Sequence, residues 1–151
     1  MNALLTKLWR LAKPVQWRFL YFVNAKFMCG ITGVVRTEDG RVLLLRHRLW
    51  PAERPWGFPT GYAKKGERHE DTITREVREE TGLTVEVGRL LKINSGFKLR
   101  IEVYYEATLV GDFENLRLDE REVLEARLFT LDELPAGMPD GHRELLQLVS
   151  R

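Results

Sequence analysis

Apolar positions near the start of the chain recur at helical spacing, at Leu4, Leu8, Leu11 and Val15. This spacing predicts a helix, which Pro14 is expected to kink or end because proline lacks the N–H that a helix interior needs. The pattern then changes to apolar runs over 27–37 and 41–47, which predict two strands joined by a turn at 38–40. The second run is almost wholly apolar, which is typical of a strand buried on both faces.

In the rest of the chain, prolines predict a loop and a second helical pattern predicts a helix. Residues 48–61 contain three prolines and predict an irregular loop. A helix is expected over 68–81, with Gly82 in the left-handed conformation that ends many helices. The remaining segments are two strands over 83–94 and 97–110, a strand over 122–131 and a closing helix over 142–151. The fold class is therefore α/β of the α+β kind, with helices around a strand-rich middle.

The chain is 151 residues long, the size of one domain. Its net charge of +2 is uneven, because residues 1–37 hold six basic and no acidic side chains, which leaves −4 for 38–151. We predict a basic amphipathic helical extension over 1–26 and a domain over 27–151. Cys29 alone cannot form an internal disulfide, and no stretch approaches the roughly 20 apolar residues of a membrane span. A reducing, cytoplasmic location is expected.

The chemistry is concentrated in GYAKKGERHEDTITREVREETGL, residues 61–83. Glu76, Glu79 and Glu80 stand at positions i, i+3 and i+4 of the predicted helix, so their carboxylates share one face and repel by a few tenths of a kcal/mol per pair. Clustered carboxylate oxygens suit a hard divalent cation such as Mg²⁺, which can neutralise phosphates and acidify a bound water. A solvated face of ion pairs would explain the charges but not the glycines at either end of the stretch. The spacing therefore predicts a metal site.

The same stretch fits Gly, five residues, Glu, seven residues, then Arg-Glu-apolar-x-Glu-Glu-x-Gly-apolar, without a gap. It resembles the signature box of the Nudix hydrolases. Trp56–Gly61 is similar to the lead-in of that box, and Leu131–Pro135 is similar to a segment near the C-terminus of family members. The specific resemblance covers 56–83. It implies the Nudix fold, a mixed β-sheet sandwiched between helices (α-β-α), and hydrolysis that depends on Mg²⁺, with Mn²⁺ as an alternative.

The resemblance also implies roles for the matching residues. The metal-binding residues would be Glu76, Glu79, Glu80 and, through its backbone carbonyl, Thr60. The catalytic residues would be Glu79, Glu80, Arg75 and Glu67, with Glu79 or Glu80 acting in part as base and Arg75 orienting the glutamates. Many members have glycine in place of Thr60, and a left-handed backbone there would strain threonine.

Candidates outside the box stay open. Many family members recruit another acid from a distal loop, for which the candidates are Glu120, Glu122 and Glu125. Cations for the substrate's phosphates are expected among Arg46, Arg48, Arg54 and Lys64. Aromatic side chains that could stack a base are Trp50, Trp56, Phe58 and Tyr62, although Trp56 and Phe58 also suit packing of the loop.

The resemblance implies hydrolysis of the pyrophosphate bond of a nucleoside diphosphate linked to another group, such as a nucleoside triphosphate or a nucleotide sugar. No proline lies between Pro59 and Pro135, so the proline markers of ADP-ribose and NADH-cleaving members are absent. The alternatives are a non-catalytic nucleotide-sensing regulator and an RNA 5′-end pyrophosphohydrolase. For residues 1–26 we expect packing on the domain or across a homodimer interface; the alternative is contact with a membrane surface or nucleic acid.

Overall fold

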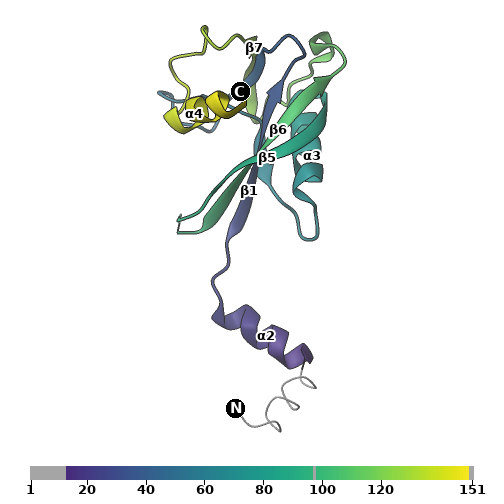
Figure 1. The fold of residues 1–151 in the computed structure, drawn as a ribbon, viewed down its shortest axis with the longest axis vertical. Coiled ribbons are helices and arrows are strands. Elements are labelled where there is room, and N and C mark those ends of the chain that lie inside the picture. The colour runs from purple at the N-terminus through teal and green to yellow at the C-terminus, as the bar shows by residue number, and fades with distance from the viewer. Residues whose placement is uncertain (1–12, 97, 150–151) are drawn as a thin grey trace.

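The computed structural model describes residues 13–96 and 98–149 (Figure 1). The apolar positions Leu4, Leu8 and Leu11 of the predicted first helix therefore lie outside the described residues. Within the described residues, helices pack on both sides of one mixed sheet, as expected.

The described residues form one seven-stranded sheet. Its strands are β1 (Met28–Arg36), β2 (Val42–His47), β3 (Trp56–Gly57), β4 (Thr60–Tyr62), β5 (Thr84–Asn94), β6 (Arg100–Val110) and β7 (Val123–Phe129). The main order is β3-β2-β1-β6-β5, with β4 paired to β1 and β7 paired to β2. β1 and β6 run parallel and the other pairs run antiparallel, which makes the sheet mixed. The long strands match the predicted ranges, and β3 and β4 are short strands within the proline-containing segment that was predicted as an irregular loop.

Two helices cover the two faces of the sheet (Figure 1). α3 (His69–Thr81) buries Ile73 and Val77 in a cluster with Leu43 and Leu45 of β2. α4 (Asp140–Val149) buries Leu145 in a second cluster, which contains Val42 and Leu44 from the same strand. β2 thus sends alternate side chains to opposite layers, which is why its sequence is apolar almost throughout.

α2 (Lys13–Val23) stands beyond the start of β1, away from the sheet (Figure 1). Pro14 is thus the second described residue of a helix that runs to Val23, and the predicted helix before it lies outside the described residues. The side chains of Trp17 and Phe22 are 72% and 73% exposed. The expected packing against the domain is not seen for this part of the extension, because the chain between Val23 and Met28 leads the helix off the end of the sheet. Among residues 13–96 and 98–149, no helix has both the length and the apolar character needed to cross a bilayer.

Candidate active site

α3 begins and ends as its sequence predicts. It follows Arg68, which is extended, and ends at Gly82, whose φ is +70° and whose N–H bonds to the carbonyl of Arg78 at 2.9 Å. A left-handed residue at this position favours glycine because a Cβ would be strained there. Ile73 and Val77 are buried against the sheet, whereas Arg75 and Glu76 point toward β4 and the segment that joins β4 to α3.

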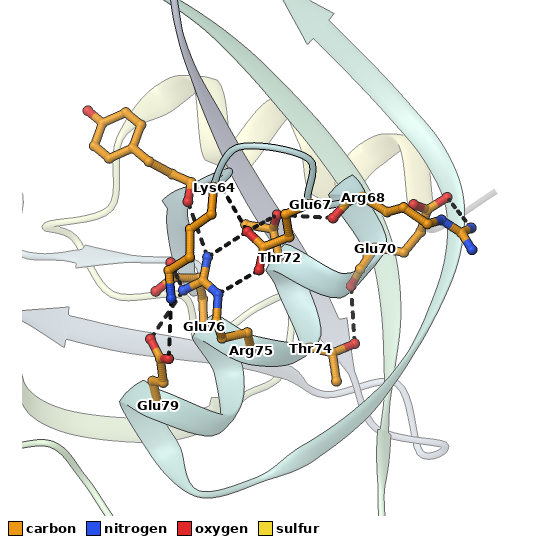
Figure 2. Close-up of polar contacts among 10 residues, drawn as sticks. Lys64, Glu67, Arg68, Glu70, Thr72, Thr74, Arg75, Glu76 and Glu79 are labelled. Atoms are coloured by element: carbon orange, nitrogen blue, oxygen red, sulfur yellow. Dashed lines mark hydrogen bonds and ion pairs between the residues drawn. The ribbon is translucent and has the colours of Figure 1, made fainter.

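Arg75 is the centre of an ion-pair network (Figure 2). Its Nε and Nη2 donate to the two carboxylate oxygens of Glu67 at 2.7 and 3.0 Å, and its Nη1 donates to Glu76 and Glu79. The guanidinium also donates to the backbone carbonyl of Tyr62 at 3.2 Å. Arg75 therefore ties the helix to the loop and contacts two of the three clustered glutamates, an arrangement compatible with the orienting role predicted for it.

Glu67 has all its oxygens engaged. Besides Arg75, it accepts hydrogen bonds from the backbone N–H of Lys64 at 2.8 Å and from the Thr72 hydroxyl at 3.0 Å (Figure 2). These donors, Arg75 above all, lower the pKa of Glu67 to about 2. A carboxylate so fully bonded acts as an anchor for Arg75, and this arrangement supports the structural part of the mixed role predicted for it.

Glu76 lies against the glycine of the box. Its side chain is only 15% exposed, and burial raises its pKa. An added Cβ on Gly61 would stand 1.9 Å from Cδ of Glu76, so a side chain at position 61 cannot coexist with this carboxylate position. The glycine is needed for close approach, since its φ is not among the positive values.

Glu80 is the most deeply buried of the three box glutamates. Its side chain is 4% exposed, whereas that of Glu79 is 56% exposed. Oε2 of Glu80 has no hydrogen-bond partner, and Oε1 lies 3.8 Å from Nδ1 of His47. Burial, followed by the negative charges of Glu76 and Glu122, raises the pKa of Glu80 to about 9. An orphaned buried carboxylate oxygen with further carboxylates nearby is a position that a cation would satisfy.

Thr60 lies in β4 with ordinary backbone angles, because no described residue other than glycine has a positive φ. β4 pairs with β1, and the hydroxyls of Thr32 and Thr60 bond at 2.8 Å. The strain expected for threonine at this position is therefore absent, since the strand pairing keeps the residue extended.

The loop before β7 docks onto the end of α3. The backbone N–H groups of Arg117 and Asp119 donate to the carbonyls of Thr81 and Glu80 at 2.8 and 3.1 Å. These bonds satisfy carbonyls that the last turn of a helix leaves without partners. They also bring Glu122 close enough to raise the pKa of Glu76 and Glu80.

The structure separates the three distal acids. Glu122 lines the same cavity as Glu76 and Glu80. Glu125 instead pairs with Arg127 along β7, and Glu120 offers its backbone carbonyl to Nε of Arg48 at 2.9 Å. Glu122 is therefore the distal acid placed beside the box.

The box opens into a cavity of about 900 Å³. Its lining includes Thr60, Gly61, Glu76, Glu80 and Glu122. It also includes residues that the sequence did not mark as functional, among them His47, Asn94, Arg100, Glu102, Tyr104 and His142. Of these, only His47 had a local signal, as a polar side chain closing an apolar strand beside Arg46. The rest depend on β5, β6 and α4 reaching the site from distant parts of the chain.

The four cations proposed for phosphate binding lie outside this cavity lining. Arg46 is exposed on β2, Arg54 is exposed in the loop, and Lys64 lies 3.9 Å from Glu79. Arg48 holds the loop that carries Glu122, through the carbonyl of Glu120. Arg100 lines the cavity and pairs with Glu102 at 2.7 Å.

The proposed aromatic platform divides into two pairs. Trp50 and Tyr62 line the cavity, whereas Phe58 is fully buried and Trp56 packs edge-on against Phe129. Trp50 stacks on His47 with ring centres 4.1 Å apart. Burial lowers the pKa of His47 to about 4, so this ring is neutral at physiological pH.

Within the described residues, no group of three or more acidic, histidine or cysteine side chains is close enough together to hold a metal ion as the side chains stand. Arg75 binds oxygens of both Glu76 and Glu79. The donor set nevertheless fits a hard cation, because Glu80 keeps a buried oxygen without a partner and the nearby groups are carboxylates.

Comparison with known proteins agrees with this geometry. The chain is 36% identical over 108 residues to the NAD-capped RNA hydrolase NudC of Mycobacterium tuberculosis, which covers 69% of this chain and 34% of that protein. It is 32% identical over 66 residues to the ADP-ribose pyrophosphatase of Methanocaldococcus jannaschii, covering 44% of this chain and 38% of the relative. The chain thus spans little more than a third of the length of these curated relatives.

A solved structure and a family model complete the comparison. The crystal structure of a NUDIX hydrolase from Nitrosomonas europaea has the same fold, with a TM-score of 0.73 and 22% identity over 85% of this chain and 73% of that one. The model of the NUDIX domain matches residues 26–149. With the complete box on α3 and the mixed sheet between helices, the chain belongs to the NUDIX family.

Proposed function

We propose that this protein hydrolyses the pyrophosphate bond of a nucleoside diphosphate derivative in a reaction that requires Mg²⁺. The observation behind this proposal is the negative charge of the cavity lining. Four glutamates, Glu76, Glu80, Glu102 and Glu122, line it beside one arginine, Arg100. A phosphate chain would be repelled from such a surface unless cations bound there first.

The residues that would hold the metal are Glu76, Glu79, Glu80 and Glu122, with the backbone carbonyl of Thr60. The orphaned Oε2 of Glu80 supports this set, because a cation would give that buried oxygen a partner. Bound Mg²⁺ supplies positive charge to the pyrophosphate and lowers the pKa of a coordinated water.

The protein's own residues would position the reacting groups and accept the proton. Glu67 holds Arg75, and Arg75 holds Glu76 and Glu79 in place. Glu79 and Glu80 are the candidates for the base, of which Glu79 is open to solvent and Glu80 faces the cavity. The phosphates would lie beside Glu76, Glu80 and Glu122. The nucleoside would lie toward Trp50, His142 and Tyr104, whose rings lie close together in the lining.

The test is a substrate screen with Mg²⁺ or Mn²⁺ that compares the native chain with Glu79→Gln and Glu80→Gln. Loss of turnover by at least about a hundredfold in one or both is expected, because each change removes a carboxylate that would bind the metal or accept the proton. Glu70→Gln is the matched control, since Glu70 lies on the same helix and pairs with Arg68 away from the cavity. Full turnover in both glutamate variants, or in excess chelator, contradicts the proposal.

A second candidate is an RNA 5′-end substrate, since a 36% identical relative is named an NAD-capped RNA hydrolase. The screen therefore includes NAD-capped and triphosphorylated RNA beside nucleoside triphosphates, nucleotide sugars and ADP-ribose. A nucleotide sensor is the non-catalytic alternative; binding of a nucleotide without turnover of any substrate would favour it.

A further inference from the structure

We propose that α2 docks the protein on an anionic lipid surface, with its aromatic side chains inserted at the headgroup level. The exposure of this helix is the first observation. Val15, Trp17, Phe19, Tyr21, Phe22 and Val23 are all more than half exposed. They cover most of the circumference of the helix, and a helix that is apolar nearly all round is stable only where something buries it.

The side chains of α2 indicate how it can be buried. Trp and Tyr favour the membrane–water interface, where an apolar ring can be buried while its polar group stays wet. The described helix therefore suits a position in the interface.

The positive charge of the N-terminal segment indicates which kind of surface it would bind. Residues 1–26 contain five basic side chains and no acidic one. Pairing two copies of this segment would bring like charges together, whereas an anionic headgroup layer attracts each of them. Nucleic acid would also attract the charge, but it offers no apolar phase for Val15, Phe19 and Val23.

The adjoining end of the domain continues the same surface. The backbone N–H of Met28 bonds to the carbonyl of Leu99 at 2.8 Å, which places the tip of the β5–β6 hairpin beside the chain that leaves α2. Exposed apolar side chains at this end are Phe27, Met28, Ile93 and Leu99. Lys98 in the hairpin is also exposed. A membrane under α2 would therefore also meet an apolar and basic edge of the domain.

The experiment is co-sedimentation of the full chain with vesicles of phosphatidylglycerol and phosphatidylcholine, compared with pure phosphatidylcholine. Binding to the anionic vesicles that weakens with added salt is expected. The double variant Trp17→Glu/Phe22→Glu should lower the partition coefficient at least about tenfold, because it removes two aromatic side chains from the interface.

The matched control is Val110→Glu/Leu131→Glu, which adds the same charge at exposed apolar positions, including the far end of β6. It should weaken vesicle binding much less than the α2 variant does. Circular dichroism and turnover of a soluble nucleotide would confirm that both variants are folded.

Three results would overturn the proposal. The first is equal vesicle binding by the native chain and the α2 variant. The second is a dimer in sedimentation velocity that the α2 variant dissociates, without vesicle binding, which would make a second copy the occupant. The third is RNA binding through α2 without vesicle binding.

Discussion

The three clustered glutamates share one helix but have three environments. Glu76 is held by Arg75 against Gly61, Glu79 faces solvent, and Glu80 is buried with an oxygen that lacks a partner. Burial therefore raises the pKa of Glu80 and, less strongly, that of Glu76. These differences suit a site in which each carboxylate has its own task.

Gly61→Ala should remove most activity while the protein stays folded. The added Cβ would overlap the carboxylate of Glu76, which must move out of the site. A displacement of this size is expected to cost turnover on the order of a hundredfold. Gly88→Ala is the control, since a Cβ there meets its nearest atom at an ordinary 3.5 Å. Steady-state kinetics and circular dichroism measure the two effects, and unchanged kinetics in Gly61→Ala would refute the role given to this contact.

At the scale of elements, α3 is held at both ends by neighbouring loops. Glu67 and Arg75 fasten the first half of the helix to the segment after β4. The N–H groups of Arg117 and Asp119 fasten its last turn and so set the position of Glu122. The position of the site residues therefore depends on the two loops that bind to α3.

Glu67→Gln should lower kcat about tenfold and leave KM nearly unchanged, because it loosens Arg75 without touching the residues proposed to surround the nucleoside. Its melting temperature should also fall, since a paired carboxylate with a pKa of about 2 is lost. Glu70→Gln controls for the loss of one charge near the start of α3. A rise in KM alone would point to substrate contact instead of positioning.

At the scale of the molecule, the sheet separates two apolar clusters. The cavity is lined by residues from elements on both sides of the sheet. α3 supplies the glutamates from one layer, and the start of α4 supplies His142 from the other. Three side chains in the cavity lining, Glu80, His47 and His142, have strongly shifted pKa values, so the stability of the fold should vary with pH.

The metal-free protein should lose stability as the pH rises from about 7.5 to 9. The pKa of Glu80 is raised from 4.5 to about 9, so the folded state holds a proton that the unfolded chain releases. This contribution is complete below pH 4.5 and is lost as the pH rises through about 9. His47 and His142, with pKa values lowered from 6.5 to about 4, give a slope of the opposite sign that fades only above about pH 7.5, where the unfolded histidines have lost their protons.

Thermal unfolding in chelator over this pH range measures the effect. Glu80→Gln should flatten the profile, because glutamine does not titrate. Mg²⁺ should raise the melting temperature of the native chain at the alkaline end, since a ligand that binds only the folded state stabilises it. Identical profiles for the native chain and Glu80→Gln would show that Glu80 does not titrate in this way.

Local patterns were enough to predict much of this protein. Helical spacing and the glycine after Thr81 defined α3, and the apolar run before His47 defined β2 as a strand with two buried faces. The spacing of Glu76, Glu79 and Glu80 was sufficient to suggest a metal site that would bind phosphates. Such features depend on residues within one or two turns or one strand, where the backbone period alone determines which side chains share a face.

The tertiary structure alone decided which distant residues reach the site. The choice of Glu122 over Glu120 and Glu125 depends on a loop bonded to the end of α3. The same holds for Arg100, Tyr104 and His142, which strand pairing and helix packing bring to the cavity while Arg46 and Arg54 stay outside its lining. The sequence by itself determined the glutamate cluster, because its spacing along one helix is local. The residues that surround this cluster were determined only by the tertiary structure, because packing across the sheet, and not the order of neighbouring residues, brings them together.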